Sequence, residues 1–181
     1  MNEEQMERNL DRVNMWIGNC DQKASFLLAF LGVAATIIMT SDVVGKIKQI
    51  LIYPFIAYWR DDVGSFNFWR FLLAVCLVVG AVCIFIALVN LLLCLMAKTD
   101  YSKFKQLGMK EKSRLFYGHI ASMTFDEFSQ DDNDILNDLR SQTYTNACIC
   151  DTKFKHYNIA LKLTLAAIPL FAFAFIIMLF V

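Results

Sequence analysis

Three long stretches of this 181-residue chain contain no Asp, Glu, Lys or Arg. They are Ala24–Ser41 with 18 residues, Phe71–Ala97 with 27 and Leu163–Val181 with 19. A helix rises about 1.5 Å per residue, so roughly 20 residues cross the hydrocarbon core of a bilayer, which is about 30 Å thick. None of the stretches has the polar face that a soluble helix of this length normally shows. The sequence therefore predicts an all-α integral membrane protein with three transmembrane helices.

The charged residues outside these stretches divide the chain into six segments. In order, we expect a cytoplasmic amphipathic helix (1–22), a transmembrane helix (23–42), an external loop (43–69), a second transmembrane helix (70–97), a cytoplasmic helical region (98–160) and a third transmembrane helix (161–181). The first span follows an acidic polar segment rather than the short basic segment of a secretory signal, so we expect it to be retained.

The distribution of Lys and Arg predicts the orientation of the chain. Ten of the 17 lie between Lys98 and Lys162, and Arg8, Arg12 and Lys23 precede the first span. Three spans place these two segments on one side, and basic segments favour the cytoplasmic side. We therefore expect a multi-pass protein with a cytoplasmic N-terminus and an external C-terminus.

Local patterns predict the helices outside the spans. An apolar stripe at steps of three and four residues indicates one helix from Glu3 to Ser41, and this stripe is expected to pack against another part of the same protein. Its members are Met6, Leu10, Val13, Ile17 and Cys20. In the external loop, the aromatic stretch from Tyr53 to Trp59, together with Trp69, is typical of a segment at the lipid–water boundary.

The region between the second and third spans contains three further signals. Lys110–Met123 predicts a short helix, and Thr124 with Glu127 predicts a capping box. A C-terminal helix is expected from about Asp131 to the end of the chain, because acids fill its first turns and nothing interrupts its pattern before Pro169.

Several function classes are disfavoured by the composition. A formal net charge of zero provides no argument for nucleic acid as a partner. The chain has two His residues and no nucleophile motif or phosphate-binding loop, so we expect no catalytic residues and no enzyme. Cys148 and Cys150 are too close in sequence for the usual zinc spacing, so we expect no metal site.

A carboxylate and an ammonium stand two residues apart before two of the spans. Asp21 and Lys23 precede the first span, and Asp151 and Lys153 precede the third. Residues two apart point to opposite sides of a helix, so neither pair can close within its own helix. Pairing between the helices, contact with a ligand, and plain charge among lipid headgroups all remain open. If the helices pair, Asp21 meets Lys153 or Lys23 meets Asp151.

Polar residues recur at helical spacing beside these charges. Asn14 lies seven residues before Asp21, and Asn146 lies seven before Lys153, with Gln142 one turn earlier. Where apolar packing is expected, such rows indicate either a polar cavity between helices or a solvated face.

Three stretches that follow one another along nearly the whole chain carry a resemblance to a known family. They read NMWIGNCDQKASFLLAFLGVAATII, RLFYGHIASMTFDEFSQ and DLRSQTYTNACICDTKFKHYNIAL. They resemble the transmembrane effectors of Pycsar antiphage systems, in which Asp-x-Lys-Ala leads into the first span and Lys followed by an aromatic residue leads into the last.

The resemblance implies a protein of the bacterial inner membrane that is harmless until phage infection activates a cyclase. The effector then binds a cyclic nucleotide, cyclic UMP or cyclic CMP, on its cytoplasmic side, oligomerises or rearranges, and disrupts the membrane. No other cofactor is implied. Basic residues here are scattered rather than clustered, so such a ligand would lie between helices or subunits. The candidate ligand-binding residues are phosphate partners, aromatic residues that could stack on a base, and members of the polar rows: Asp21, Lys23, Arg114, Phe116, Tyr117, Phe125, Arg140, Asn146 and Lys153.

The spans also predict a homo-oligomer, because they contain too few polar side chains to line an aqueous path in a monomer. Gly32 and Thr36 would allow close helix approach, and Asn90 would face another helix rather than lipid. Two other functions remain open: a structural or assembly membrane subunit without a nucleotide ligand, and a small constitutive channel. A cyclase gene beside this one would favour the effector.

Overall fold

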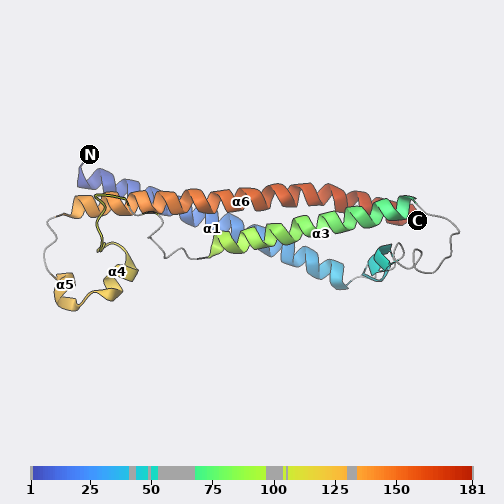
Figure 1. Cartoon of the computed structure of the whole chain (residues 1–181), viewed down its shortest axis with the longest axis horizontal. Helices are drawn as coiled ribbons and strands as arrows, with labels where there is room; N and C mark the ends of the chain where they lie inside the picture. Colours follow the sequence, from blue (N-terminus) through green and yellow to red (C-terminus); the bar gives the residue numbers. More distant parts are fainter. Residues whose placement is uncertain are drawn as a thin grey trace. The chain divides into compact units, whose positions relative to one another are not determined.

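The computed structural model describes residues 2–40, 44–48, 50–52, 68–96, 104, 106–129 and 134–180. All regular secondary structure in these ranges is helical: α1 is Glu3–Thr40, α3 is Phe68–Leu95, α4 is Tyr117–Ser122, α5 is Phe125–Ser129 and α6 is Ile135–Phe180 (Figure 1). Residues 44–48 and 50–52 are helical too. Because α1, α3 and α6 are each long and apolar enough to cross a membrane, the predicted all-α membrane class is confirmed.

The 38 residues of α1 form one uninterrupted helix, as the sequence predicted. A reciprocal cap begins it: Gln5 N donates to Asn2 Oδ1 at 3.0 Å, and Asn2 N donates to Gln5 Oε1 at 3.3 Å. The predicted apolar stripe is the more buried side of its first turns, with Met6 4% exposed and Cys20 fully buried.

The C-terminal helix, α6, has 46 residues. It begins at Ile135, and residues 131–133, where the sequence predicted its start, lie outside the described ranges. Pro169 lies inside the helix and removes one backbone donor, which helices in membranes tolerate.

The predicted helix over Lys110–Met123 is wrong in its first half, since only Tyr117–Ser122 is helical. The preceding residues, 106–116, form a non-helical segment that we term the strap, and Gly108 makes a turn near its start with φ of 89°. Side chains of α6 accept hydrogen bonds from backbone N–H groups of the strap, so those groups are not available for helical bonds. Tertiary contacts therefore override the local helical pattern.

The chain forms two compact units, which are described separately. Unit 1 comprises Met1–Lys23 and Leu93–His156, and unit 2 comprises Ala24–Leu92 and Tyr157–Val181. The core of unit 2 is formed by Leu73, Leu77 and Ala174, with Ile47, Ile50, Leu51, Phe171 and Ile177 packed against it. The helical residues after α1 therefore pack on α3 and α6.

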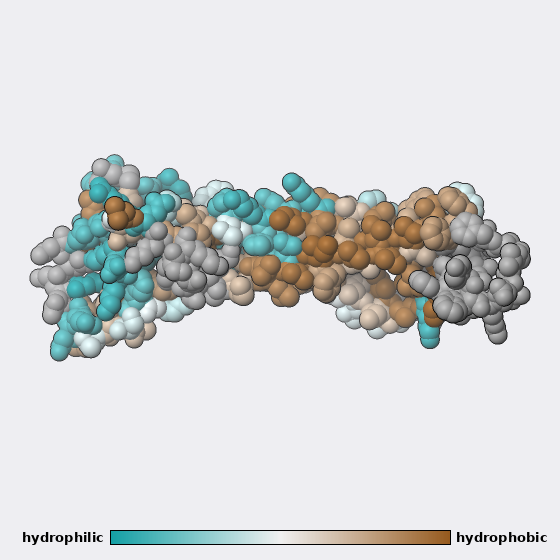
Figure 2. Space-filling model, viewed as in Figure 1, coloured by the Kyte–Doolittle hydropathy of each residue, from teal (hydrophilic) through white to brown (hydrophobic). Residues whose placement is uncertain are grey.

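The outward side chains of unit 2 are large and apolar. Phe26, Phe30 and Phe85 are 83%, 59% and 68% exposed. The visible face of this unit is mostly brown in Figure 2, whereas that of unit 1 is mostly teal. An apolar surface of this extent is typical of contact with lipid. Of the predicted boundary aromatics, Trp69 is exposed on α3, and Tyr53–Trp59 lie outside the described residues.

Candidate functional site

Two polar contacts connect α1 and α6 within unit 1. Asn146 Nδ2 donates to Asn14 Oδ1 at 2.8 Å, and Lys153 Nζ donates to Asp21 Oδ1 at 2.6 Å. Each contact joins residues 132 positions apart in the sequence. The two helices are therefore parallel and in register here, with the contacts about 10 Å apart along them. We term these two contacts the polar ladder. Of the alternatives that the sequence left open, the structure shows pairing between the helices, with Asp21 against Lys153.

Lys153 also contacts the third long helix. Its ammonium donates to the carbonyl oxygen of Cys94 at 2.8 Å. α3 ends one residue later, and the last carbonyls of a helix lack helical partners, so this bond caps the helix. The Lys153 side chain is 6% exposed and that of Asp21 is 37% exposed. One buried ammonium therefore joins α1, α3 and α6 in unit 1.

The alternative pairing, between Lys23 and Asp151, does not form. Asp151 Oδ2 instead contacts Lys155 Nζ, one turn along α6, at 2.6 Å. The hydrogen bond and the charge of Asp151 raise the pKa of Lys155 above its usual value. Both side chains are exposed, and such surface pairs contribute little to stability. Lys23 is exposed as well.

Two buried thiols lie beside the contacts of Lys153. The sulfur atoms of Cys20 and Cys94 are 3.7 Å apart, and both residues are fully buried. Burial, with the neighbouring thiol, raises the pKa of Cys20 to about 12, and burial also raises that of Cys150. These groups are therefore neutral thiols that act as apolar packing, not as nucleophiles. Within the described ranges, His, Cys, Asp and Glu form no group of three able to hold a metal ion.

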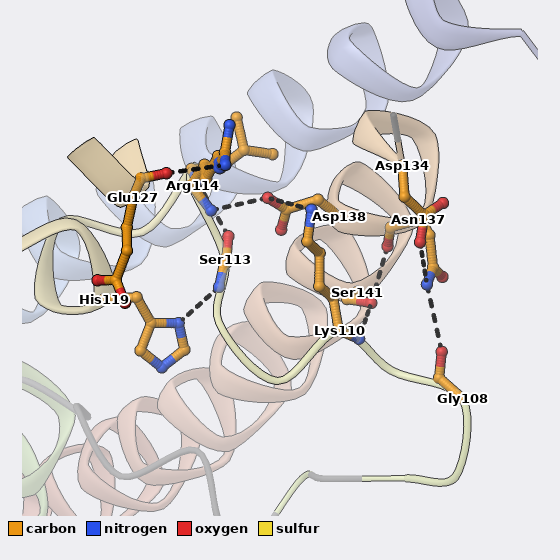
Figure 3. A network of polar contacts seen from close by, with 11 residues as sticks. Gly108, Lys110, Ser113, Arg114, His119, Glu127, Asp134, Asn137, Asp138 and Ser141 are labelled. Carbon is orange, nitrogen blue, oxygen red and sulfur yellow. Dashed lines mark hydrogen bonds and ion pairs between the residues drawn. The ribbon is translucent and has the colours of Figure 1, made fainter. Parts of the chain in front are cut away.

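A second polar network fastens the strap to the start of α6 (Figure 3). Arg114 N donates to Asp138 Oδ2 at 2.8 Å, and Lys110 N donates to Ser141 Oγ at 3.1 Å. Lys110 also places its ammonium 4.0 Å from the same Asp138 oxygen. Asp138 and Ser141 are 1% and 7% exposed. The main chain of the strap is thus held by buried side chains from one face of α6.

The aromatic residues beside the strap form a small ring cluster. Ser113 N donates to His119 Nδ1 at 2.9 Å. The Phe116 ring lies edge-on to His119, with centroids 5.4 Å apart, and 4.7 Å from the Tyr117 ring. The cluster closes the end of the strap that leads into α4.

The predicted capping box is confirmed at the start of α5. Thr124 N donates to Glu127 Oε2 at 2.9 Å, and Glu127 N donates to Thr124 Oγ1 at 3.2 Å. The bond from the Thr124 amide lowers the pKa of Glu127 below its usual value. Arg114 Nη2 donates to the Glu127 carbonyl at 2.9 Å, which ties the strap to this turn.

The nine candidate ligand-binding residues fall into three groups. The ladder contains Asp21, Asn146 and Lys153. Arg114 and Phe116 belong to the strap. Exposed side chains outside the ladder and the strap belong to Lys23, Tyr117, Phe125 and Arg140, and of these the Tyr117 ring contacts Phe116 of the strap. The structure thus brings the first three together and does not gather all nine into one site.

Sequence reasoning missed Lys110 and Asp138, the charged pair beneath the strap. A signal was present at the start of α6, where Asp138, Ser141 and Thr145 recur at steps of three and four residues and are all buried. A polar row at helical spacing in a region of mixed charge resembles a solvated face, which is why the pattern alone does not reveal its burial.

The three residues proposed for helix packing lie in unit 2. Thr36 Oγ1 donates to the Gly32 carbonyl at 2.9 Å, and Asn90 Nδ2 donates to the Ile86 carbonyl at 2.9 Å, both within a single helix. A Cβ atom at Gly32 would meet no heavy atom within 4 Å. Gly32 therefore faces outward and leaves room for a neighbouring helix.

The fold and the two networks define a helical membrane protein whose charged unit is organised by buried polar contacts. The Pycsar effector protein domain matches residues 5–180, so the chain belongs to this family. It is 29% identical over 160 residues to the Pycsar effector protein GmPycTM of Gulbenkiania mobilis, which covers 86% of this chain and 82% of that protein. No solved structure matches the chain. The resemblance noted from the sequence is confirmed, and the protein is an antiphage membrane effector.

Proposed function

We propose that a cyclic pyrimidine nucleotide, cyclic UMP or cyclic CMP, made by a cognate cyclase switches this effector on. The nucleotide binds unit 1 on the cytoplasmic side of the inner membrane. The effector then rearranges and self-associates, the membrane is disrupted, and the infected cell is halted. Membership of the Pycsar effector family supports the messenger class.

The observation that carries the proposal is the three-way contact of Lys153. Its ammonium bonds to Asp21 of α1 and to the Cys94 carbonyl of α3. Each of the three long helices also contains a candidate span. Movement of either acceptor leaves a buried charge without its partner, which is strongly unfavourable. A ligand that prefers another arrangement of these helices can therefore shift the population between two discrete states.

The proposed orientation follows from the basic residues. Ten of the 17 lie between the second and third spans, so this region and the N-terminus are cytoplasmic and the C-terminus is external. A nucleotide made in the cytoplasm then meets unit 1 directly. Cysteine labelling with a membrane-impermeant maleimide in intact cells tests this topology, with single cysteines placed at Ser129 and Gly45.

Self-association is supported by the open outward position of Gly32. Gly32→Leu should block close approach of a second copy without disturbing the fold, because nothing lies within 4 Å of the added Cβ. Killing should fall while membrane insertion and thermal melting stay unchanged. Crosslinking that yields only monomers from the wild type at every nucleotide concentration would exclude assembly.

Proteoliposomes with a trapped dye test the whole proposal. Cyclic UMP or cyclic CMP should release dye from vesicles that contain the wild-type protein, and cyclic AMP should not. Lys153→Met should alter this response, whereas Lys155→Met should not, because Lys155 lies in an exposed pair on the same helix. If neither pyrimidine nucleotide binds the protein or releases dye, the structural or assembly subunit becomes the better explanation.

A further inference from the structure

Asp138 has an unsatisfied carboxylate oxygen in the interior of unit 1. Its Oδ2 accepts from Arg114 N at 2.8 Å and lies 4.0 Å from Lys110 Nζ. Its Oδ1 is buried and has no hydrogen-bond partner among the described residues. Native proteins leave few buried polar atoms in this condition, because each forfeits its hydration without compensation. Figure 3 shows the carboxylate directed from α6 toward the strap.

A ligand that satisfies Oδ1 needs two properties. It must bring a donor, because an ionised carboxylate only accepts hydrogen bonds, and it must place negative charge near the Lys110 ammonium. A 3′,5′-cyclic ribonucleotide has both. Its free 2′-hydroxyl is a donor, and the adjacent ring carbon carries the 3′-oxygen of the cyclic phosphate. Acidic side chains bind ribose hydroxyls in dinucleotide sites, and lysine binds phosphate as a point charge.

We infer that the nucleotide site lies between the strap and the start of α6. Asp138 Oδ1 accepts the ribose 2′-hydroxyl, and the Lys110 ammonium contacts the cyclic phosphate. The inference rests on the proposed function and names the residues that recognise the same messenger. Neither residue was among the nine candidates taken from the sequence, and the two lie 28 residues apart.

The nucleotide reaches Oδ1 only when the strap moves. Two backbone bonds hold the strap closed, from Arg114 N to Asp138 and from Lys110 N to Ser141. Near the start of the strap, the contact from Asn137 Nδ2 to the Gly108 carbonyl is long, at 3.5 Å, whereas Gln106 Nε2 donates to Tyr144 Oη of α6 at 2.6 Å. The closed strap leaves Oδ1 without a donor, whereas a state with bound nucleotide supplies one. Binding therefore favours a displaced strap, and α6 carries both Asp138 and Lys153 on one continuous helix.

Analogues that lack the hydroxyl test the inference. Isothermal titration of the full-length protein in detergent compares cyclic UMP with 2′-deoxy-cyclic UMP, and cyclic CMP with its 2′-deoxy form. The wild type should bind the ribonucleotide about 10- to 100-fold more tightly than the deoxy form, because a hydrogen bond to a charged group is lost. Asp138→Asn should bind both forms with similar, weaker affinity.

Two matched variants separate recognition from general damage. Lys110→Met should weaken the ribo and deoxy forms by the same factor, because it removes the phosphate contact and leaves the hydroxyl contact. Asp126→Asn should change neither affinity, because this exposed acid lies on α5 and not among the residues that hold the strap to α6. If Asp138→Asn fails to fold in thermal melting, the wild-type analogue comparison and Lys110→Met decide the question.

The possible failures are distinguishable. If the wild type binds the ribo and deoxy forms equally, the inference is overturned while the proposed function stands. The same holds if Asp138→Asn folds and still discriminates between them, since the hydroxyl is then recognised elsewhere. If the wild type binds neither cyclic UMP nor cyclic CMP, the inference and the proposed function fall together.

Discussion

The two units of the protein bury different kinds of side chain on the same helix. In unit 1, α6 buries the apolar Leu139, Ile149 and Cys150 together with five polar residues: Asp138, Ser141, Gln142, Thr145 and Lys153. In unit 2, the buried residues of α6 are small: Ala160, Thr164, Ala167 and Ala174. Hydrogen bonds and ion pairs depend on direction, so they select one register, whereas small side chains permit close approach in several. The comparison indicates that polar contacts in unit 1 set how α1, α3 and α6 pair.

The outer surfaces differ as well. Unit 2 exposes phenylalanine side chains, and lipid tails are as apolar as these residues, so burial provides little drive for its helices to associate. Unit 1 exposes charged pairs such as Arg8 with Glu4, at 3.3 Å. A charged ligand can therefore act on unit 1 directly, while unit 2 presents the surface suited to the bilayer.

The largest expected effect comes from reversing the charges of the ladder. Asp21→Lys places a second ammonium against Lys153, and Lys153→Asp places two carboxylates together, so each single change should abolish killing and lower the melting temperature. The double exchange should recover part of the loss, with a coupling energy of about 1–3 kcal/mol. Thermal melting and a toxicity assay of all three variants measure this.

A different outcome would identify the ladder as a ligand contact. In that case each single change would abolish nucleotide binding with unchanged melting, and the double exchange would rescue nothing. Variants that all bind, melt and kill like the wild type would reduce Asp21 and Lys153 to interfacial charges.

Removing the buried ammonium should have the next largest effect. Lys153→Met removes the ammonium that donates to Asp21 and to the Cys94 carbonyl, at a cost of about 3 kcal/mol in the free energy of unfolding. The partial exposure of Asp21, at 37%, allows water to reach it and keeps the loss from being larger. Denaturant unfolding in detergent measures the change, and Lys155→Met serves as the exposed control. Equal effects of the two substitutions would contradict the structural role of Lys153.

A smaller effect on the free energy of unfolding is expected from changes in helix packing at the glycines of unit 2. A Cβ at Gly80 would lie 3.0 Å from the Phe171 ring, so Gly80→Ala should cost about 1 kcal/mol as the ring shifts. Gly32→Ala should be neutral or slightly stabilising, because its Cβ meets open space and alanine favours helix. The same unfolding measurement compares them. If Gly80→Ala costs more than Lys153→Met, close packing rather than polar contact determines how the helices pair.

The smallest effect concerns the capping box. The bond from the Thr124 amide lowers the pKa of Glu127 from the usual 4.5. A carboxyl group with a lowered pKa in the folded state contributes stability above pH 4.5, and this is lost as the pH falls through the folded value. The protection of the α5 amides against hydrogen exchange, relative to the intrinsic rate at each pH, should therefore fall below that pH. Glu127→Gln should remove this dependence, and Asp126→Asn should retain it.

Local features were predictable because neighbouring residues control them. The capping box depends on Thr124 and Glu127 alone, and the length of α1 follows from an unbroken period without proline. The strap was not predictable in the same way. Its backbone donors meet acceptors 24 and 31 residues later, at Asp138 and Ser141, and no local pattern reports that distance.

By itself, the sequence determined the helical membrane class, the three spans and the family, because charge-free length, helical period and short motifs are properties of contiguous residues. It also showed the two polar rows, Asn14 with Asp21 and Asn146 with Lys153, but did not show which residues contact each other. Only the tertiary structure decided that Lys153 meets Asp21 and the Cys94 carbonyl, since these contacts join residues 132 and 59 positions apart. The burial of Asp138 was decided in the same way, because the amide that contacts this carboxylate belongs to Arg114, 24 residues earlier in the sequence.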